Sequence, residues 1–460
     1  MMLTHYKYIY FLGIGGIGMS ALARWFNING FEVAGYDRTP SALTDTLQSE
    51  GISVHFDDSA AMIPAEFLLH PAQTLVVLTP AVPADHSEFN YLKSNGFTIQ
   101  KRSQVLGLIA GGMFTIGVAG THGKTTTSSM TAHLLRHSGV NCAAFLGGIT
   151  QNYGTNMLLN EPSDDLSRVP CVVEADEFDR SFLTLYPEIA IVTSTDADHL
   201  DIYGNHDSVL ASFSAYVSQI KPTGCLFMRK GLKLADKTSA KVVEYSLNEG
   251  DYHAENIRIE NACFLFDVVH PRGSIKDLTL QVPGFHNVEN AVAAIAATLE
   301  IGLSEDQIRE GIKTFGGVKR RFEYYLKTDS KVLIDDYAHH PAEVSAFLSS
   351  AKALYPHRHV TAVFQPHLYS RTRDFAEEFA QSLSLADSVI LLDIYPAREL
   401  PIEGVSSDLI FDKITCDKVQ CTKSELVDII KNRSTDVVAT IGAGDIDRYI
   451  EPIKSVLSES

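Results

Sequence analysis

The stretch GTHGKTTT, residues 120–127, decides the fold of the chain around it. The apolar run MFTIGVA before it predicts a buried strand, and SSMTAHLLRHSG after it predicts a helix that stops at Gly139. A strand, a glycine loop with a lysine and then a helix is the context of a phosphate-binding loop. Backbone N–H groups in such a loop and at the helix N-terminus attract anions. The stretch therefore predicts a site for a nucleoside triphosphate, with a purely structural glycine turn as the alternative.

Two side chains of this loop carry its expected chemistry. Lys124 supplies a mobile positive charge for the phosphates, and Thr125 offers a hydroxyl to Mg²⁺. One position departs from the usual G-x-x-x-x-G-K-T pattern, because Val118 stands where the first glycine would fall. The nearest glycines are Gly117 and Gly120, so the sequence predicts a variant loop.

Composition limits the classes of partner. A chain of 460 residues is too long for one core and predicts two or three domains. With 45% hydrophobic and 20% charged residues it has the make-up of a soluble globular protein. A net charge of −18 argues against nucleic acid or an anionic membrane as the main partner. The six scattered cysteines form no CxxC pair, and no run is long enough to span a bilayer, so we expect a cytoplasmic protein without membrane insertion.

The first segment opens with a glycine-rich βαβ pattern. Gly13, Gly15 and Gly18 form G-x-G-x-x-G after an apolar strand, and Asp37 ends the next strand about twenty positions later. Small residues let a diphosphate approach the helix N-terminus, and the carboxylate can bind ribose hydroxyls. NAD and a UDP-sugar fit this pattern equally well. The alternative to a ligand site is that the glycines only allow tight packing of the helix on the strand.

Further candidates of this segment follow its later strands. TLVVLTPAVP predicts a buried strand that ends in the loop Thr79, Pro80 and Ala81, a place where open α/β sheets bind ligands. Arg102 and Ser103 in TIQKRSQVLG are candidates for ligand contact, although an ordinary surface role is equally consistent with their types.

In the second segment two strands end in clustered polar residues. PCVVEADEFD predicts a strand followed by four carboxylates, at residues 174, 176, 177 and 179, which cannot all be metal ligands. As a cluster beside a phosphate loop they predict a Mg²⁺ site rather than a solvated loop. EIAIVTSTDADHLDIYG predicts another buried strand, after which His199 is a functional candidate with a satisfied structural histidine as the alternative.

Two more groups of the second segment remain open on residue type alone. Asn287 and Asn290 begin the long helix GFHNVENAVAAIAATLEIG, where they cap the helix or read the edge of an adenine. Arg320 and Arg321 in FGGVKRRFEYY suit a phosphate clamp or a basic surface loop.

The third segment repeats strand, polar loop and helix four times, which predicts a small Rossmann-like domain with a binding face at one edge. The polar residues that the loops bring to this edge are His339, His340, His367, Arg371, Arg373, Arg398 and Glu399.

Taken together, the motifs GIGGIGMSALA, GTHGKTTT, EADEFD, DADHLD, HNVENAVAA, DDYAHHP, QPHLYSRT and YPARE resemble the Mur ligases of peptidoglycan synthesis, in order and across nearly the whole chain. The resemblance implies an enzyme that couples ATP hydrolysis to joining an amino acid onto a UDP-linked muramyl carboxylate. It also implies an α/β fold of three domains: residues 1–112, Rossmann-like, for the UDP-substrate; residues 113–321, with the ATP-binding P-loop and a mainly parallel sheet; and residues 322–460, Rossmann-like, for the amino acid.

The family's site residues carry over by motif. The resemblance implies catalytic roles for Lys124, Glu174, His199 and Arg321, and Mg²⁺ bound by Thr125, Glu174 and His199. It implies ATP contacts from Gly120, Thr121, His122, Gly123, Lys124, Thr125, Thr126, Asn290, Arg321 and Asp336. For the UDP-substrate it implies Gly15, Gly16, Ile17, Gly18, Asp37, Thr79, Pro80, Ala81, Arg102 and Ser103. For the amino acid it implies His340, His367 and Arg371.

The glycine-rich opening favours the branch that adds L-alanine to UDP-N-acetylmuramate over the recycling branch that attaches a tripeptide. Leu368 stands where some relatives carry arginine, and the absence of lysine between His199 and Lys221 argues against the carbamoylated lysine of sibling ligases. We expect a monomer or homodimer. An NAD-dependent dehydrogenase and a non-catalytic nucleotide switch are alternatives of other classes, but the dehydrogenase leaves the P-loop unexplained.

Overall fold

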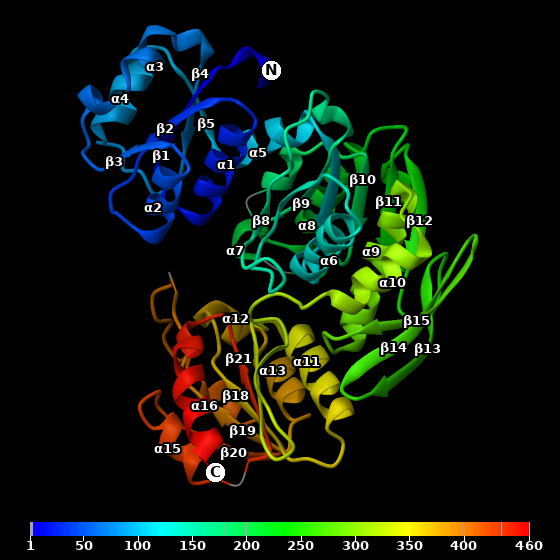
Figure 1. Cartoon of the computed structure of the whole chain (residues 1–460). Helices are drawn as coiled ribbons and strands as arrows, with labels where there is room; N and C mark the ends of the chain where they lie inside the picture. The colour runs from blue at the N-terminus through cyan, green and yellow to red at the C-terminus, as the bar shows by residue number, and fades with distance from the viewer. Residues whose placement is uncertain (1–2, 179, 198–199, 398, 434, 460) are drawn as a thin grey trace. The chain divides into compact units, whose positions relative to one another are not determined.

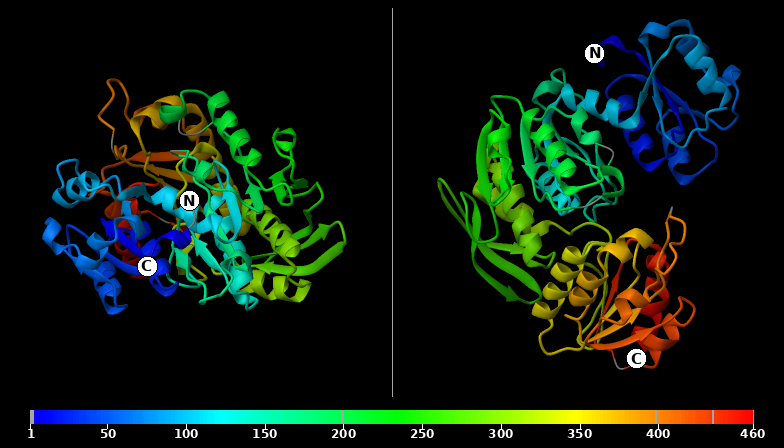
Figure 2. Two further views of the ribbon diagram at one scale, coloured as in Figure 1. Left: turned by 90° about the horizontal axis from the view of Figure 1, so that it is seen from above. Right: turned by 180° about the vertical axis from the view of Figure 1, so that it is seen from behind.

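The computed structural model describes residues 3–178, 180–197, 200–397, 399–433 and 435–459 (Figures 1 and 2). The chain forms two compact units. The first unit comprises residues 1–147, 155–245 and 293–307, and the second comprises residues 148–154, 246–292 and 308–460. Each unit is built on its own sheets.

The first sheet of the first unit is entirely parallel. Its order, β3-β2-β1-β4-β5, places β1 beside both β2 and β4, as expected for a dinucleotide-binding fold. The strands are β1 (Tyr8–Leu12), β2 (Glu32–Tyr36), β3 (Ser53–His55), β4 (Thr74–Leu78) and β5 (Thr98–Lys101).

Helices cover both faces of this sheet because the residues of β1 alternate between two cores. Ile9 and Phe11 pack in one hydrophobic cluster, while Tyr8, Tyr10 and Leu12 pack in the other. The first cluster takes residues from α1 (Ile17–Ile28), α2 (Ala42–Ser49) and α5 (Arg102–Gly111). The second takes residues from α3 (Ala65–Leu69) and α4 (Ser87–Ser94).

The second sheet of the first unit has the order β12-β11-β10-β6-β9-β7-β8. Its β7–β8 pair is antiparallel, and the other pairs are parallel. The strands are β6 (Phe114–Ala119), β7 (Ala143–Phe145), β8 (Met157–Leu158), β9 (Pro170–Glu174), β10 (Ile189–Val192), β11 (Cys225–Arg229) and β12 (Lys241–Tyr245).

The P-loop lies at the carboxyl edge of this sheet. Its strand β6 pairs with β9 on one side and with β10 on the other, so the segments after all three strands meet at the same edge. The helix after the loop, α6 (Lys124–His137), begins earlier than the sequence suggested and includes the lysine and the threonines. Two more helices of this region are α7 (Leu200–Tyr203) and α8 (His206–Ser218).

The second unit contains a three-stranded antiparallel sheet and a six-stranded sheet. The smaller sheet consists of β13 (His253–Glu260), β14 (Cys263–His270) and β15 (Gly273–Leu280). It is followed in the chain by α9 (Phe285–Ile301) and α10 (Glu305–Thr314). The three strands carry none of the motifs, and we interpret them as scaffold, whereas α9 contains the motif HNVENAVAA.

The six-stranded sheet has the order β16-β17-β21-β18-β19-β20 and is parallel except for β16. Its strands are β16 (Glu323–Lys327), β17 (Val332–Asp336), β18 (Val360–Phe364), β19 (Ser388–Leu391), β20 (Asp417–Gln420) and β21 (Val437–Ile441). The last two residues of strand β17 are Asp335 and Asp336, which places both carboxylates at the carboxyl edge of the sheet.

Helices also cover both faces of this sheet (Figure 1). One core contains residues of α11 (Pro341–Leu354), α13 (Ala376–Leu383) and α14 (Asp408–Phe411), and the other contains residues of α15 (Leu426–Lys431) and α16 (Ile450–Glu459). The short α12 (Tyr369–Asp374) follows β18.

These sheets confirm the α/β fold with Rossmann-like ends and a mainly parallel central sheet. Among the described residues, the helices include none with the length and apolar character needed to cross a bilayer. The division at residues 112 and 321 stays a prediction.

Candidate active site

The backbone of the P-loop requires glycine at two positions. Gly120 has a φ of 141°, and a Cβ atom there would lie 2.0 Å from the Thr193 hydroxyl oxygen. Gly123 has a φ of 81° and directly precedes α6. Both conformations strongly favour glycine, so the loop is fixed by its own sequence and by the end of β10.

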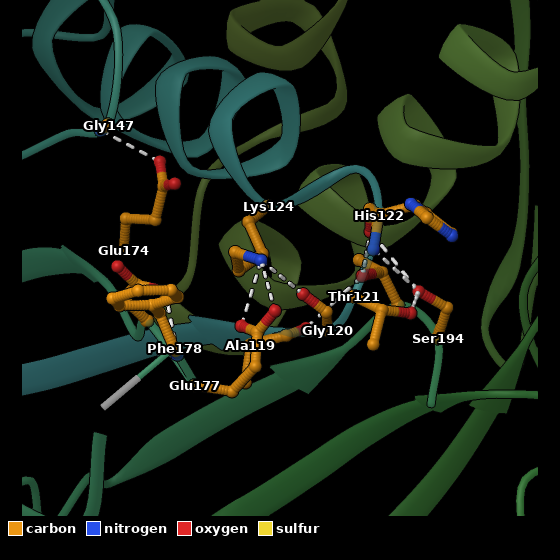
Figure 3. A network of polar contacts seen from close by, with 12 residues as sticks. Ala119, Gly120, Thr121, His122, Lys124, Gly147, Glu174, Glu177, Phe178 and Ser194 are labelled. Carbon is orange, nitrogen blue, oxygen red and sulfur yellow. Dashed lines mark hydrogen bonds and ion pairs between the residues drawn. The ribbon is translucent and has the colours of Figure 1, made fainter. Parts of the chain in front are cut away.

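Ser194, one residue past Thr193, braces the loop from the neighbouring strand (Figure 3). Its Oγ lies 2.8 Å from Thr121 Oγ1 and accepts a hydrogen bond of 2.8 Å from the backbone N–H of His122. The Asp196 N–H donates to Thr121 Oγ1 at 3.1 Å. The sequence prediction missed Ser194, although its position after a strand adjacent to β6 was the available signal.

Lys124 points to the acidic segment after β9 (Figure 3). Its Nζ lies 2.8 Å from each carboxylate oxygen of Glu177 and 2.6 Å from the Gly120 carbonyl oxygen. Burial alone lowers the pKa of Lys124, but the carboxylates of Glu177 and Glu174 outweigh it and hold that pKa above its usual value. Lys124 is therefore a charged ammonium inside the loop.

Glu174, the last residue of β9, faces the first turn of α6. Its Oε1 accepts from Thr125 Oγ1 at 3.0 Å, and its Oε2 accepts from the Gly147 N–H at 2.7 Å. Burial raises the pKa of Glu174, and the charge of Lys124 partly offsets this. The sequence prediction missed Gly147, because no motif marks the loop after β7.

The carboxylate oxygens of Glu174 and the hydroxyl oxygen of Thr125 are ligands of the type that a hard cation such as Mg²⁺ prefers. Asp176 is directed elsewhere, since its Oδ1 accepts from the Phe178 N–H at 3.1 Å and closes a turn. The predicted metal ligand His199 and the neighbouring carboxylates Asp179 and Asp198 lie outside the described residues. Thr126 is buried in the first turn of α6.

The glycine loop after β1 also gathers its predicted residues. Asp37 Oδ2 accepts from the Gly15 N–H at 2.7 Å, and Gly16 and Ile17 are exposed at the start of α1. A Cβ atom on Gly18 would lie 3.1 Å from the Arg102 side chain, so the arginine covers this glycine. The loop, the carboxylate and one basic residue therefore form one surface.

The loop after β4 packs against Gly13, the first glycine of the loop after β1. A Cβ atom on Gly13 would lie 2.4 Å from Thr79 Cγ2, which explains the glycine there. Pro80 and Ala81 are exposed. Ser103 differs, because its carbonyl oxygen accepts from Thr184 Oγ1 at 3.2 Å within the scaffold.

Arg320 and Arg321 have different partners in the second unit. The guanidinium of Arg320 donates to Asp335 Oδ2 at 3.0 Å and to the Gly442 carbonyl oxygen at 2.6 Å, which commits it to the six-stranded sheet. The guanidinium of Arg321 lies 5.3 Å from the ring centre of Tyr337 and 3.9 Å from Glu343 Oε1. The candidate clamp is therefore one arginine, with a carboxylate neighbour that the sequence prediction did not include.

Two further predicted nucleotide residues of this unit hold local structure. Asp336 accepts from the backbone N–H groups of Phe322, at 2.7 Å, and Ala338, at 2.8 Å. Burial raises the pKa of Asp336 to about 7. In α9 the Asn290 Nδ2 donates to Asn287 Oδ1 at 3.3 Å, and Asn287 in turn donates to the Pro283 carbonyl oxygen at 2.7 Å.

The residues predicted for the amino acid lie on the loops after β17 and β18. His340 caps α11, and its ring lies 5.1 Å from that of Phe375. The ring of His367 stacks at 5.8 Å on Tyr395, and Arg371 is buried in α12. Leu368 directly precedes α12 and has a φ of 75°, a strained conformation of the kind found at binding sites.

The other polar residues expected at this edge have separate roles. His339 Nδ1 lies 3.4 Å from Glu343 Oε2, and Glu399 accepts from Ser370 Oγ at 2.5 Å. Arg373 forms an exposed ion pair with Asp374, and Arg398 lies outside the described residues.

Three family models match the chain in order. The "Mur ligase family, catalytic domain" matches residues 8–113, the "Mur ligase middle domain" residues 118–298, and the "Mur ligase, glutamate ligase domain" residues 320–444. A UDP-N-acetylmuramate–L-alanine ligase from Phocaeicola vulgatus is 52% identical over 98% of this chain and 98% of its own. The chain belongs to the Mur ligase family. This Mur ligase therefore has a relative that matches it from end to end.

Solved structures agree with this assignment. The UDP-N-acetylmuramate–alanine ligase from Thermotoga maritima matches this Mur ligase with a TM-score of 0.75 and 28% identity, over 98% of this chain and 99% of that one. A murein peptide ligase from Psychrobacter arcticus matches with a TM-score of 0.65 and 24% identity, over 99% of each chain, which shows a common fold.

Proposed function

We propose that this Mur ligase joins L-alanine to the carboxylate of UDP-N-acetylmuramate at the expense of ATP, in the synthesis of peptidoglycan precursors. The observation that carries the proposal is the P-loop, in which Lys124 pairs with Glu177 and Thr125 contacts Glu174, in a chain 52% identical to an L-alanine ligase of that kind. The family match leaves the dehydrogenase hypothesis without support.

The chemistry follows from the poor reactivity of a carboxylate towards an amine. A carboxylate oxygen of the substrate attacks the γ-phosphorus of ATP in line, the bond to the β-phosphate oxygen breaks, and an acyl phosphate and ADP form. The neutral amine of alanine then attacks the acyl carbon. Phosphate leaves with the bonding electrons, the amide forms, and the amine nitrogen loses its proton.

We assign the charged groups of the site to the first of these steps. Lys124 binds the phosphates, and Arg321 offsets the negative charge that develops during transfer. Thr125 and Glu174 supply oxygen ligands for Mg²⁺, together with His199 as implied by the family, and bound Mg²⁺ would neutralise phosphate charge. The remaining predicted nucleotide contacts, including Asn290 and Asp336, belong to this proposal.

We further propose that the three domains divide the substrates. Residues 1–112 bind the UDP-substrate through the glycine loop and Asp37, residues 113–321 bind ATP, and residues 322–460 bind alanine through His340, His367 and Arg371. We expect the enzyme in the cytoplasm, where its nucleotide substrates occur. With the substrates divided in this way, the enzyme accelerates ligation mainly by holding the reacting groups in position.

Phosphate release measured with ATP, Mg²⁺ and single or paired substrates tests the proposal. We expect release that needs both UDP-N-acetylmuramate and L-alanine, and no comparable release when a tripeptide replaces alanine. Efficient use of the tripeptide would assign the chain to the recycling branch instead, and release without an acceptor would indicate a nucleotide switch.

A substitution of the lysine tests the site itself. Lys124→Ala removes the phosphate-binding charge, so we expect loss of ligation in a protein that still folds. Lys221→Ala is the matched control, because Lys221 pairs with Glu188 on the surface of the same unit. Near-normal ligation by the Lys124 variant would contradict the assignment.

A further inference from the structure

Two carboxylates at the end of β9 and in the acidic segment after it have different partners. Glu174 contacts Thr125 in the first turn of α6, whereas Glu177 contacts Lys124. Lys124 donates hydrogen bonds to Glu177 Oε1 at 2.8 Å and to the Gly120 carbonyl oxygen at 2.6 Å. The second carboxylate oxygen of Glu177 completes the ion pair at 2.8 Å. Glu177 is thus the counter-ion of this lysine in the structure.

A nucleotide phosphate needs at least one N–H donor of Lys124. The phosphates and the Glu177 carboxylate are both anions, so they compete for the same ammonium group. We propose that Glu177 is a positioning residue for Lys124, a counter-ion that holds the lysine, yields it to the phosphates and takes it back when the nucleotide leaves. This role rests on the nucleotide site of the proposed function and goes beyond it.

The backbone around Glu177 is held firmly. Its carbonyl oxygen accepts from the Tyr203 hydroxyl at 2.5 Å and from the Arg180 N–H at 2.9 Å. Its side chain is 1% exposed, compared with 13% for Lys124. Because the carboxylate cannot turn to solvent without moving this segment, the flexible four-carbon stem of the lysine is the part that moves.

Competition of this kind has a measurable consequence. The apparent dissociation constant of a nucleotide rises by the factor by which the held state of Lys124 outweighs the released state. A weaker partner at position 177 lowers that factor and tightens nucleotide binding. A carboxylate that only supported the fold, or that held the lysine in its binding position, would weaken binding when it was replaced.

Glu177→Gln tests this directly, because it keeps the size and one oxygen acceptor but removes the charge. We expect ADP, titrated by calorimetry in the presence and absence of Mg²⁺, to bind about 3- to 10-fold more tightly than to the wild type. The melting temperature of the variant should fall at the same time, because a buried ammonium group loses its counter-ion. Tighter binding with lower stability is a combination that a purely structural role does not give.

Glu188→Gln is the matched control. Glu188 also pairs with a lysine, Lys221, in the same unit, so its loss should lower stability and leave ADP affinity unchanged. If Glu177→Gln fails to fold, Glu177→Asp keeps the charge but shortens the reach, and it should still tighten ADP binding about 2-fold.

Unchanged or weaker ADP binding by the folded Glu177 variant would overturn the proposal. The dissociation rate of ADP in stopped flow gives a second reading, and the proposal requires a slower rate in the variant. A wild-type protein that binds no ADP would instead overturn the proposed function, so the two failures are distinguishable.

Discussion

Gly147 offers the sharpest test of the geometry around Glu174. Its N–H donates to Glu174 Oε2 at 2.7 Å, and a Cβ atom at this position would lie 2.2 Å from Oε1 and 2.4 Å from Cδ of the same carboxylate. Gly147→Ala therefore forces the carboxylate to move by about 1 Å to reach an ordinary non-bonded distance. Such a shift also disturbs the contact to Thr125.

The size of the effect follows from the need to position charge accurately during phosphoryl transfer. A misplacement of about 1 Å costs about 100-fold in rate, or about 2.7 kcal/mol of transition-state stabilisation. Since Glu174 is a proposed metal ligand, the loss should appear in kcat/KM and in the Mg²⁺ concentration needed for half-maximal rate. ADP affinity without Mg²⁺ should change less than about 2-fold, because Lys124 is not displaced.

Phosphate release with UDP-N-acetylmuramate and L-alanine present measures kcat/KM and the Mg²⁺ dependence. Calorimetry measures the affinity for ADP without Mg²⁺. Gly111→Ala is the control, since a Cβ atom at the end of α5 meets nothing within 4 Å. Glu174→Asp in the Gly147→Ala background restores space, so the double variant should be more active than the product of the two single effects predicts.

A Gly147→Ala variant with wild-type kcat/KM and wild-type Mg²⁺ dependence would refute the reasoning. So would a double variant that is strictly additive, because the two residues then do not act on one another. A loss of ADP affinity without Mg²⁺ would indicate a wider collapse of the loop.

The remaining predictions concern the brace of the P-loop and a buried acid. Ser194→Ala removes the acceptor for the His122 N–H, and the loss of this hydrogen bond costs about 1–3 kcal/mol. Calorimetry should therefore show ADP binding at least about 5-fold weaker. An unchanged affinity would show that Ser194 does not support the nucleotide-binding form of the loop. Glu88 is buried against Tyr10, and burial raises the pKa of Glu88 from 4.5 to about 7. Between pH 4.5 and 7 the folded state therefore keeps a proton on Glu88 that the unfolded state has lost. The contribution of protonated Glu88 to the free energy of unfolding is lost as the pH rises towards 7. In urea unfolding, Glu88→Gln should gain about 3 kcal/mol relative to the wild type between pH 4.5 and 8, and a pH-independent difference would contradict this.

The sequence could predict the sheets because their strands are short, buried and followed by polar loops. The runs before Gly120, Glu174 and Ser194 are apolar, and all three became neighbouring parallel strands. Apolar runs of this kind indicate which residues are buried but not where a helix begins. The start of α6 at Lys124 depends on the left-handed conformation of Gly123, which the residue pattern alone does not show.

The site was predictable where chemistry stands in a motif and unpredictable where it depends on the backbone. Lys124, Thr125 and Glu174 could be named in advance because charged and hydroxyl groups follow a strand. Gly147 could not, because it contributes an N–H and an absent side chain, and neither leaves a signal in a single sequence. Glu177 was named among the metal candidates, and only the contact with Lys124 separates its role from that of Glu174.

The irregular glycines of the loop now have separate physical reasons. A Cβ atom on Gly117 would lie 2.2 Å from the Tyr216 hydroxyl, so this glycine serves the packing of α8 against β6. Gly120 instead makes room for the Thr193 hydroxyl at the end of β10. Since Val118 lies within β6, the phosphate-binding turn starts only at Gly120 and is shorter than the usual pattern. A shorter turn leaves fewer N–H groups of its own for phosphate, which increases the share of binding that depends on Lys124 and on the partner that holds it.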